Sequence, residues 1–295
     1  EMEETGRISL RDFFARRGRR ILPSAAVVIV AIGFASWFIM PLLRARDVAI
    51  DMVSASLYVA NWSFIRQGTD YLAASTDHSP LLHYWSLAVE EQFYFVWAPL
   101  MVLVVLVARR LSRSWVAAVG LTVTLMTLAS LALSLLWTAS NEPLAYLGSP
   151  TRAWQFGLGA GLAMLAPTIL RASRRTEIRA GLTAAGWIGA AAIVFATVTF
   201  SEATAYPGTA ALIPTLGAAA VILAGITVLT SRASLGTVLS TSPMRAIGRL
   251  SFAWYLWHWP VLIFGQAVLG EDIGWPTKTA LVLISAFPAW LSMRL

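Results

Sequence analysis

The sequence predicts an all-α polytopic membrane protein with about eight transmembrane helices. The chain of 295 residues is 58% hydrophobic and 13% charged, whereas soluble domains carry about 25% charged residues. Eight separate segments hold the roughly 20 mostly apolar residues that one membrane crossing requires. The basic residues gather in alternate segments between these spans, as the positive-inside rule requires of a multispanning protein.

The predicted spans are apolar runs bounded by polar or basic residues. A ninth stretch, 47–60, is moderately apolar but contains Asp47 and Asp51. If it crossed, the basic segments 1–20 and 109–113 would lie on opposite sides of the membrane, so we place it in the outer interface. The eight spans cover residues 21–43, 85–108, 115–137, 151–170, 180–200, 209–230, 248–269 and 278–295.

The basic segments also define the topology. Of the 22 lysine and arginine residues, 17 fall on one side of the membrane once 47–60 is interfacial. We therefore predict a cytoplasmic arginine-rich segment at 1–20 and one membrane domain at 21–295. Its outer loop at 44–84 would contain the interfacial element. Because the chain begins with Glu1 and ends inside an apolar run, we expect both ends to be truncated.

Composition excludes several kinds of site. The chain contains no cysteine, which excludes disulfides and thiolate metal ligands. Its three histidines lack the HxxxH or HExxH spacing of a zinc site, so we predict no bound metal. The net charge of +7 follows from the membrane topology. We therefore expect the lipid bilayer, and no nucleic acid, as a partner of the basic segments.

Two adjacent acids, Glu90 and Glu91, lie inside the predicted span 85–108. A helix would place them roughly 8 Å below its outer end. An ionised carboxylate at that depth costs on the order of 2–3 kcal/mol, which favours a functional role. The alternative is that both acids reach interfacial water or pair with Arg152.

His83 lies at the outer mouth of the same span, beside the interfacial aromatics Tyr84 and Trp85. Helical spacing places His83, Glu90 and Tyr94 on one stripe. A histidine–carboxylate couple can move protons near neutral pH. The alternative is that His83 is a polar anchor at the membrane interface.

His258 lies near the middle of the predicted span 248–269. Pro260 removes a backbone donor and should leave the carbonyl of Leu256 free. Tyr255, His258 and this carbonyl would then line a tunnel. The alternative is a packed aromatic helix with a satisfied histidine.

Arginines mark two further candidate sites. Arg152 stands at the outer edge of a span whose glycines, Gly157, Gly159 and Gly161, would allow close helix approach. Near the N-terminus, two overlapping RxxR pairs precede a span. These pairs, the arginine block, consist of Arg16, Arg17, Arg19 and Arg20. Guanidinium groups bind phosphate bidentately, so the block could bind a phosphorylated ligand. From the residues alone we favour lipid headgroups as the partners of the block.

Four long blocks follow one another in the sequence: "LRDFFARRGRRILP", "LHYWSLAVEEQFYFVWAPL", "TRAWQFGLGAGLA" and "GRLSFAWYLWHWPVLIF". Together and in this order they resemble the acyltransferase-3 family of bacterial integral-membrane O-acyltransferases. The resemblance implies a ten-helix acyltransferase-3 core whose first two helices are missing from this sequence. In the family, an arginine-then-histidine motif in the first of these helices is taken to hold the catalytic base. Its likeness to members fused to an SGNH-hydrolase-like domain implies such a domain beyond the C-terminus.

The resemblance implies a function as well. The enzyme would take an acyl group from cytoplasmic acyl-CoA, with acetyl-CoA the expected donor and no permanently bound cofactor. It would deliver that group to a hydroxyl of an extracytoplasmic cell-envelope glycan or glycolipid, working in the bacterial inner membrane. One alternative is a proton-coupled transporter or flippase in which Glu90, Glu91 and His258 relay protons. The other is a non-catalytic membrane scaffold.

The resemblance finally assigns residues to these tasks. Glu90, Glu91 and His83 are the catalytic candidates, with His83 in a supporting role. The arginine block would bind the CoA phosphates on the side of the membrane opposite these acids. The substrate-binding candidates are Arg16, Arg17, Arg19, Arg20, Trp85, Ser86, Tyr94, Arg152, Tyr255 and His258.

Overall fold

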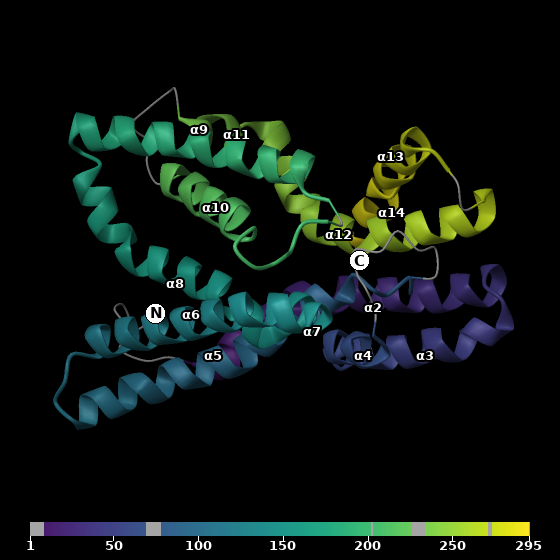
Figure 1. Ribbon diagram of the computed structural model, residues 1–295, viewed down its shortest axis with the longest axis horizontal. Coiled ribbons are helices and arrows are strands. Elements are labelled where there is room, and N and C mark those ends of the chain that lie inside the picture. Colours follow the sequence, from purple (N-terminus) through teal and green to yellow (C-terminus); the bar gives the residue numbers. More distant parts are fainter. Residues whose placement is uncertain (1–8, 69–77, 202, 226–233, 271–272, 295) are drawn as a thin grey trace. The chain divides into compact units, whose positions relative to one another are not determined.

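The computed structural model describes residues 9–68, 78–201, 203–225, 234–270 and 273–294, and the regular elements within these ranges are all helices (Figure 1). The predicted all-α fold class is therefore confirmed. The helices are α2 (Leu10–Ile39), α3 (Leu42–Ser56), α4 (Ala60–Gln67), α5 (Tyr84–Arg110), α6 (Trp115–Ser140), α7 (Glu142–Leu147), α8 (Ser149–Ala172), α9 (Thr176–Thr199), α10 (Leu212–Gly225), α11 (Leu235–Leu239), α12 (Ser242–Leu269), α13 (Trp275–Ile284) and α14 (Ala286–Ser292).

Five helical stretches in the described residues are long and apolar enough to cross a membrane: α2, α5, α6, the joined α7–α8 stretch and α9. Large apolar side chains on α2, such as Phe34 and Trp37, are each 70% exposed, as suits a surface that faces lipid. The predicted span 248–269 is a helix of 28 residues. The span expected at 209–230 has a described helix of 14 residues, α10. The count of eight crossings stays a prediction.

The chain forms two compact units. The first contains α2, α3, α4, the part of α5 up to Val102, and α12 from Ile247 onward with α13 and α14. The second contains the rest of α5, the helices α6 to α11, and the start of α12.

In the first unit, α3 folds back against α2 (Figure 1). A Cβ built on Gly33 of α2 would stand 2.6 Å from the Cε atom of Met52 of α3, so the tip of this side chain packs against Gly33. The helix α4 follows and ends at Gly68, whose φ of 67° is the left-handed conformation that commonly stops a helix. Most of the described part of the predicted outer loop 44–84 is thus helical, while its side of the membrane stays a prediction.

The C-terminal helices of the first unit are held by indole N–H groups of α12. Trp254 donates to the carbonyl of Val282 at 2.8 Å and to Oγ of Ser285 at 3.0 Å. Trp257 donates to Oγ of Ser292 at 3.3 Å. Because Ser285 separates α13 from α14, the span predicted at 278–295 is two short helices rather than one continuous helix.

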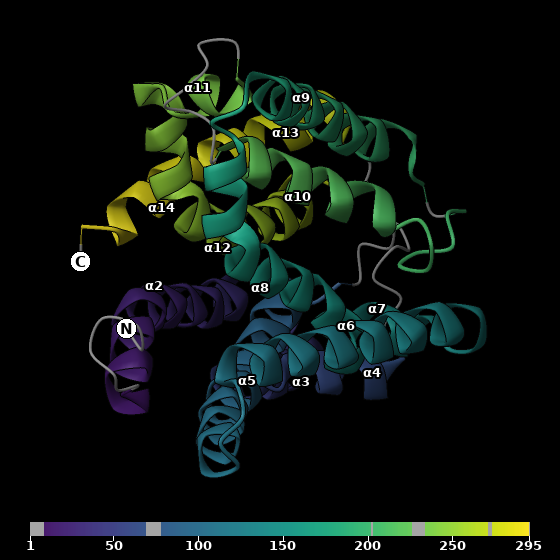
Figure 2. The same ribbon diagram turned by 90° about the vertical axis from the view of Figure 1, so that its left-hand side faces the viewer.

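In the second unit, α6 packs against α8 and α9 packs against α10, a pairing that is visible in both views (Figures 1 and 2). A Cβ on Gly157 of α8 would stand 2.1 Å from Oγ1 of Thr127, so only glycine fits this crossing. The prediction of close approach is therefore confirmed at Gly157. It is wrong at Gly159 and Gly161, where an added Cβ would meet no described atom within 4 Å.

Candidate functional site

The side chain of Arg17 lies between the two adjacent acids of α5. Its Nε donates to Oε1 of Glu91 at 2.7 Å, and its Nη2 donates to Oε1 of Glu90 at 2.5 Å. The Cζ atom of Arg17 stands 3.6 Å from the ring centroid of Tyr94, a cation–π contact. One guanidinium thus neutralises one of two carboxylates, and the cluster keeps one net negative charge.

Antiparallel packing of α2 and α5 builds this cluster. Tyr84, at the start of α5, donates to the carbonyl of Ala25 at 2.9 Å. Further along α5, Phe95 stacks on Phe14 with ring centroids 5.2 Å apart. The numbering rises on one helix as it falls on the other, and this register places Arg17 opposite the acids.

The prediction that the arginine block and the acid pair lie on opposite sides of the membrane is wrong for Arg17, which contacts both acids. Counting apolar residues began the span at residue 21, whereas α2 is one continuous helix from Leu10. Its arginine turn therefore packs along α5 instead of ending in a separate loop. The other three arginines of the block have exposed side chains; they are Arg16, Arg19 and Arg20.

Gln92 anchors α4 beside this cluster, a role that the sequence did not predict. Its Nε2 donates to the carbonyl of Tyr58 at 2.6 Å and to Oδ1 of Asn61 at 2.9 Å. Its Oε1 accepts from Nε1 of Trp62 at 3.0 Å. Burial, followed by the nearby Glu91, raises the pKa of the Tyr58 phenol. A glutamine directly after two intramembrane acids was the available signal.

His83 forms a second cluster, between the start of α5 and α12. The side chain is buried, with 1% exposed, and its Nε2 donates to the carbonyl of Leu256 at 3.0 Å. This carbonyl lies four residues before Pro260, which has no N–H to donate to it within the helix, as the sequence predicted. His83 supplies the hydrogen bond in its place. Because a carbonyl only accepts, Nε2 carries the proton and Nδ1 presents a lone pair, for which the described residues provide no partner.

Hydroxyl groups complete the second cluster. Tyr255 Oη donates to the backbone carbonyl of His83 at 2.8 Å and lies 2.5 Å from Oγ of Ser86. The ring of His258 has its centroid 6.0 Å from that of His83, and its Nδ1 donates to the carbonyl of Tyr255 at 2.5 Å. The structure thus brings four predicted site residues together, while the tunnel that they would line stays a prediction. Trp85 lies in the same first turn of α5 and is partly exposed.

The described residues show no direct contact between His83 and the acids, and a proton-transferring couple between them stays a prediction. The described contacts of His83 are with Leu256 and neighbouring rings, and every described ion pair of the acids is with Arg17. Burial lowers the pKa of His83 to about 3, so its imidazole is neutral at physiological pH. The histidine therefore acts as a hydrogen-bond donor that joins two segments.

In the second unit, Arg152 is 6% exposed and lies among aromatic rings. Its Nε donates to the carbonyl of Tyr146 at 2.8 Å. Its Cζ stands 4.8 Å from the ring centroid of Tyr146 and 5.3 Å from that of Tyr206. Whether Arg152 pairs with the acids stays a prediction, and the described ion pairs of both acids are with Arg17.

Comparison with known proteins decides the family. Residues 2–294 match the model of a family described as "Acyltransferase domain". The chain belongs to this family. The match covers the blocks that supply both clusters of the first unit and the Arg152 helix of the second, and it confirms the resemblance that the sequence predicted.

Several relatives share this region. The chain is 31% identical over 281 residues to YrhL of Bacillus subtilis, covering 94% of this chain and 43% of that protein. It is 30% identical over 282 residues to the peptidoglycan O-acetyltransferase OatA of Listeria monocytogenes, covering 91% and 42%. It is 29% identical over 269 residues to the O-acetyltransferase OatA of Staphylococcus aureus, covering 90% and 43%. The chain thus spans less than half the length of these curated relatives, and no solved structure matches it.

Proposed function

We propose that this chain is the membrane part of an enzyme that transfers an acetyl group from cytoplasmic acetyl-CoA to a hydroxyl of an extracytoplasmic cell-envelope glycan. The observation that carries the proposal is the family match over residues 2–294. The names of the relatives support acetyl as the group and peptidoglycan as the acceptor. The apolar helices support a membrane location, which we propose is the bacterial inner membrane.

Glu90 is the acid that is more open to a substrate. Its side chain is 40% exposed, whereas that of Glu91 is 10% exposed. We assign Glu91 to hold Arg17 in place, and Glu90 to accept a hydrogen bond from the acceptor hydroxyl and orient it for attack. The net negative charge of the cluster favours such a donor, and the pair would shape the acceptor site rather than attack the acyl group itself.

The hydroxyls of Ser86 and Tyr255 form the adjoining part of this proposed site. Ser86 precedes Glu90 by one helical turn, which is a rise of about 6 Å on the same face of α5. We assign both hydroxyls to substrate contact. His83 is a positioning residue, since its bond to Leu256 joins α12 to the start of α5.

Three exposed arginines of α2 supply the proposed donor site. Arg16, Arg19 and Arg20 follow the i, i+3, i+4 spacing that places side chains on one helical face. Guanidinium groups match the geometry of phosphate oxygens, and a CoA molecule carries several phosphates. Arg17 is not included, because two carboxylates hold its guanidinium.

Inverted membrane vesicles that contain the full-length protein test this assignment. Supplied with radiolabelled acetyl-CoA, they should label the enclosed glycan. The double variant Arg16→Gln/Arg19→Gln should raise the KM for acetyl-CoA at least tenfold, because two charge-assisted phosphate contacts are lost. The matched control is Arg110→Gln, an exposed arginine at the far end of α5. Wild-type vesicles without labelled glycan would contradict the function, and an unchanged KM would contradict the donor site.

A further inference from the structure

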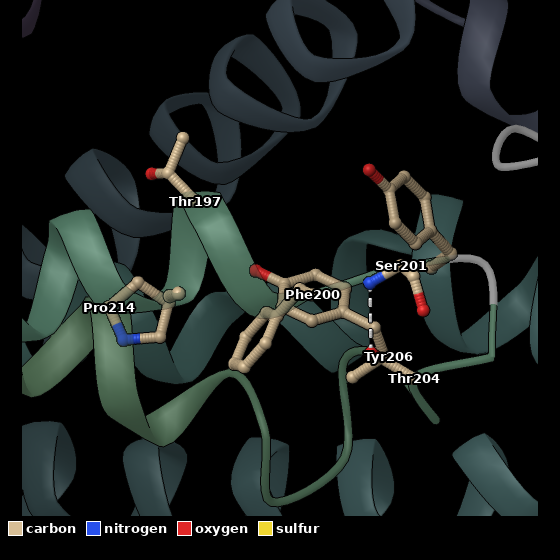
Figure 3. Close-up of a pocket in the computed structure, with 8 residues that line it drawn as sticks. Thr197, Phe200, Ser201, Thr204, Tyr206 and Pro214 are labelled. Atoms are coloured by element: carbon tan, nitrogen blue, oxygen red, sulfur yellow. Dashed lines mark hydrogen bonds between the residues drawn. The ribbon is translucent and has the colours of Figure 1, made fainter.

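The second unit contains a pocket of about 380 Å³ at one end of its helices (Figure 3). This volume lies within the range of about 300–1,000 Å³ typical of small-molecule sites. Its described wall combines aromatic rings and hydroxyl groups, and none of the described lining residues carries a charge. The lining residues that carry the argument are Tyr146, Thr197, Phe200, Ser201, Thr204 and Tyr206.

Three rings form the aromatic part of this wall, with Tyr206 in the middle. Its centroid is 5.7 Å from that of Tyr146 and 6.2 Å from that of Phe200. The Tyr206 hydroxyl makes no hydrogen bond to any residue that the structure describes. Hydroxyls of Thr197 and Ser201 stand nearby on the same wall. A ligand can therefore both stack on rings and exchange hydrogen bonds at their edges.

The wall is held in place from behind. Arg152 lies under two of its rings, at 4.8 Å from the centroid of Tyr146 and 5.3 Å from that of Tyr206. The loop after Tyr206 is bound to α6, where Oγ1 of Thr138 accepts from the backbone N–H of Gly208 at 2.9 Å. A pocket that is held in shape without its ligand loses less entropy on binding.

The position of the pocket in the second unit indicates its side of the membrane. The chain passes through α6, α8, α9 and α10 in turn, so the segments 141–150 and 203–211 lie at the same end of this unit. The other end of these helices carries the basic segments 109–113 and 171–179, which together contain seven arginines. By the positive-inside rule the basic end is cytoplasmic and the pocket faces outward.

We propose that this pocket is a binding subsite for a sugar ring of the acceptor glycan. A pyranose presents an apolar C–H face that packs on aromatic rings, and hydroxyls at its edge that bond to side-chain hydroxyls. The described lining residues are uncharged, which suits a neutral sugar, whereas the phosphates of the acyl donor would require cations. The inference rests on the proposed function, because it names the substrate class that the enzyme would receive from outside.

The test uses the full-length protein in lipid nanodiscs, so that no sugar-headed detergent competes for the pocket. The probe is an uncharged oligomer of N-acetylglucosamine, and binding is measured by saturation-transfer NMR. Tyr206→Ala removes a ring and should weaken binding at least tenfold. Thr204→Val removes only a hydroxyl, keeps the three rings, and should weaken binding by a smaller factor. The matched control is Phe195→Ala, which removes a 54% exposed ring of α9 outside the pocket and should bind like wild type.

Transfer kinetics separate this inference from the proposed function. In nanodiscs, where the oligomer concentration can be varied, Tyr206→Ala should raise the KM for the acceptor at least tenfold and leave the KM for acetyl-CoA unchanged. Transfer with wild-type acceptor KM in both Tyr206→Ala and Thr204→Val would overturn the sugar subsite while the acyltransferase stands. Probe binding that requires Tyr206 in a protein without transfer would overturn the function while the subsite stands.

Discussion

Replacing Arg17 by alanine should be the most destabilising single change in the first unit. Glu91 has only 10% of its side chain exposed, and Arg17 is its described cation. Removing one partner of a buried ion pair costs about 3–5 kcal/mol, because the remaining charge is left uncompensated. Since Glu90 is partly exposed, we expect the lower end of this range. The measurement is the thermal unfolding midpoint of the protein in micelles, which should fall.

A second change should reverse this loss. The double variant Arg17→Ala/Glu91→Gln removes both the cation and the buried negative charge, so its midpoint should recover much of the difference. Arg19→Ala is the matched control, because Arg19 is exposed on the same helix and such substitutions usually change stability by less than about 0.5 kcal/mol. Equal midpoints for Arg17→Ala and Arg19→Ala would refute the buried network.

Replacing His83 by phenylalanine should give the second large loss, and a second mutation should again restore it. The variant His83→Phe keeps a ring but leaves the Leu256 carbonyl without its described donor. An unsatisfied buried acceptor costs about 1–3 kcal/mol. In Pro260→Ala the new N–H at position 260 can reach this carbonyl within the helix, because helical bonds join residues four apart.

The two changes form a double-mutant cycle, in which the free energy of unfolding is measured for wild type, both single variants and the double variant. Pro260→Ala alone should have a small effect, since a carbonyl oxygen accepts two hydrogen bonds. Together with His83→Phe it should cancel much of the loss. Strictly additive effects would mean that His83 and Pro260 do not share this acceptor.

Several features of the first unit could be predicted from the sequence because they depend on local spacing. Apolar length predicted α5, and the position of Pro260 predicted the free carbonyl of Leu256. The arginine–acid contact could not be predicted, because a charge count assigns loops to sides but contains no information on helix register. The role of Gln92 was missed for the same reason, since its partners lie 31 and 34 residues away.

The pocket of the second unit shows a different limit of sequence reasoning. Arg152 was a candidate because it could pair with the acids and because the family resemblance assigned it to substrate binding. The rings that it supports are Tyr146 of the short helix α7 and Tyr206 of the segment before α10, which share no motif. Only the folded arrangement of these two segments brings the rings together.

The most direct test of the central claim is the transfer of radiolabelled acetyl to glycan by the full-length enzyme carrying Glu90→Gln. The change keeps the shape of the side chain and removes its charge. We expect turnover to fall at least a hundredfold, while the unfolding midpoint stays near that of wild type because Glu91 still pairs with Arg17. Glu177→Gln, at an exposed position of α9, should transfer like wild type. Undiminished transfer by folded Glu90→Gln would contradict the claim that this cluster is the functional site.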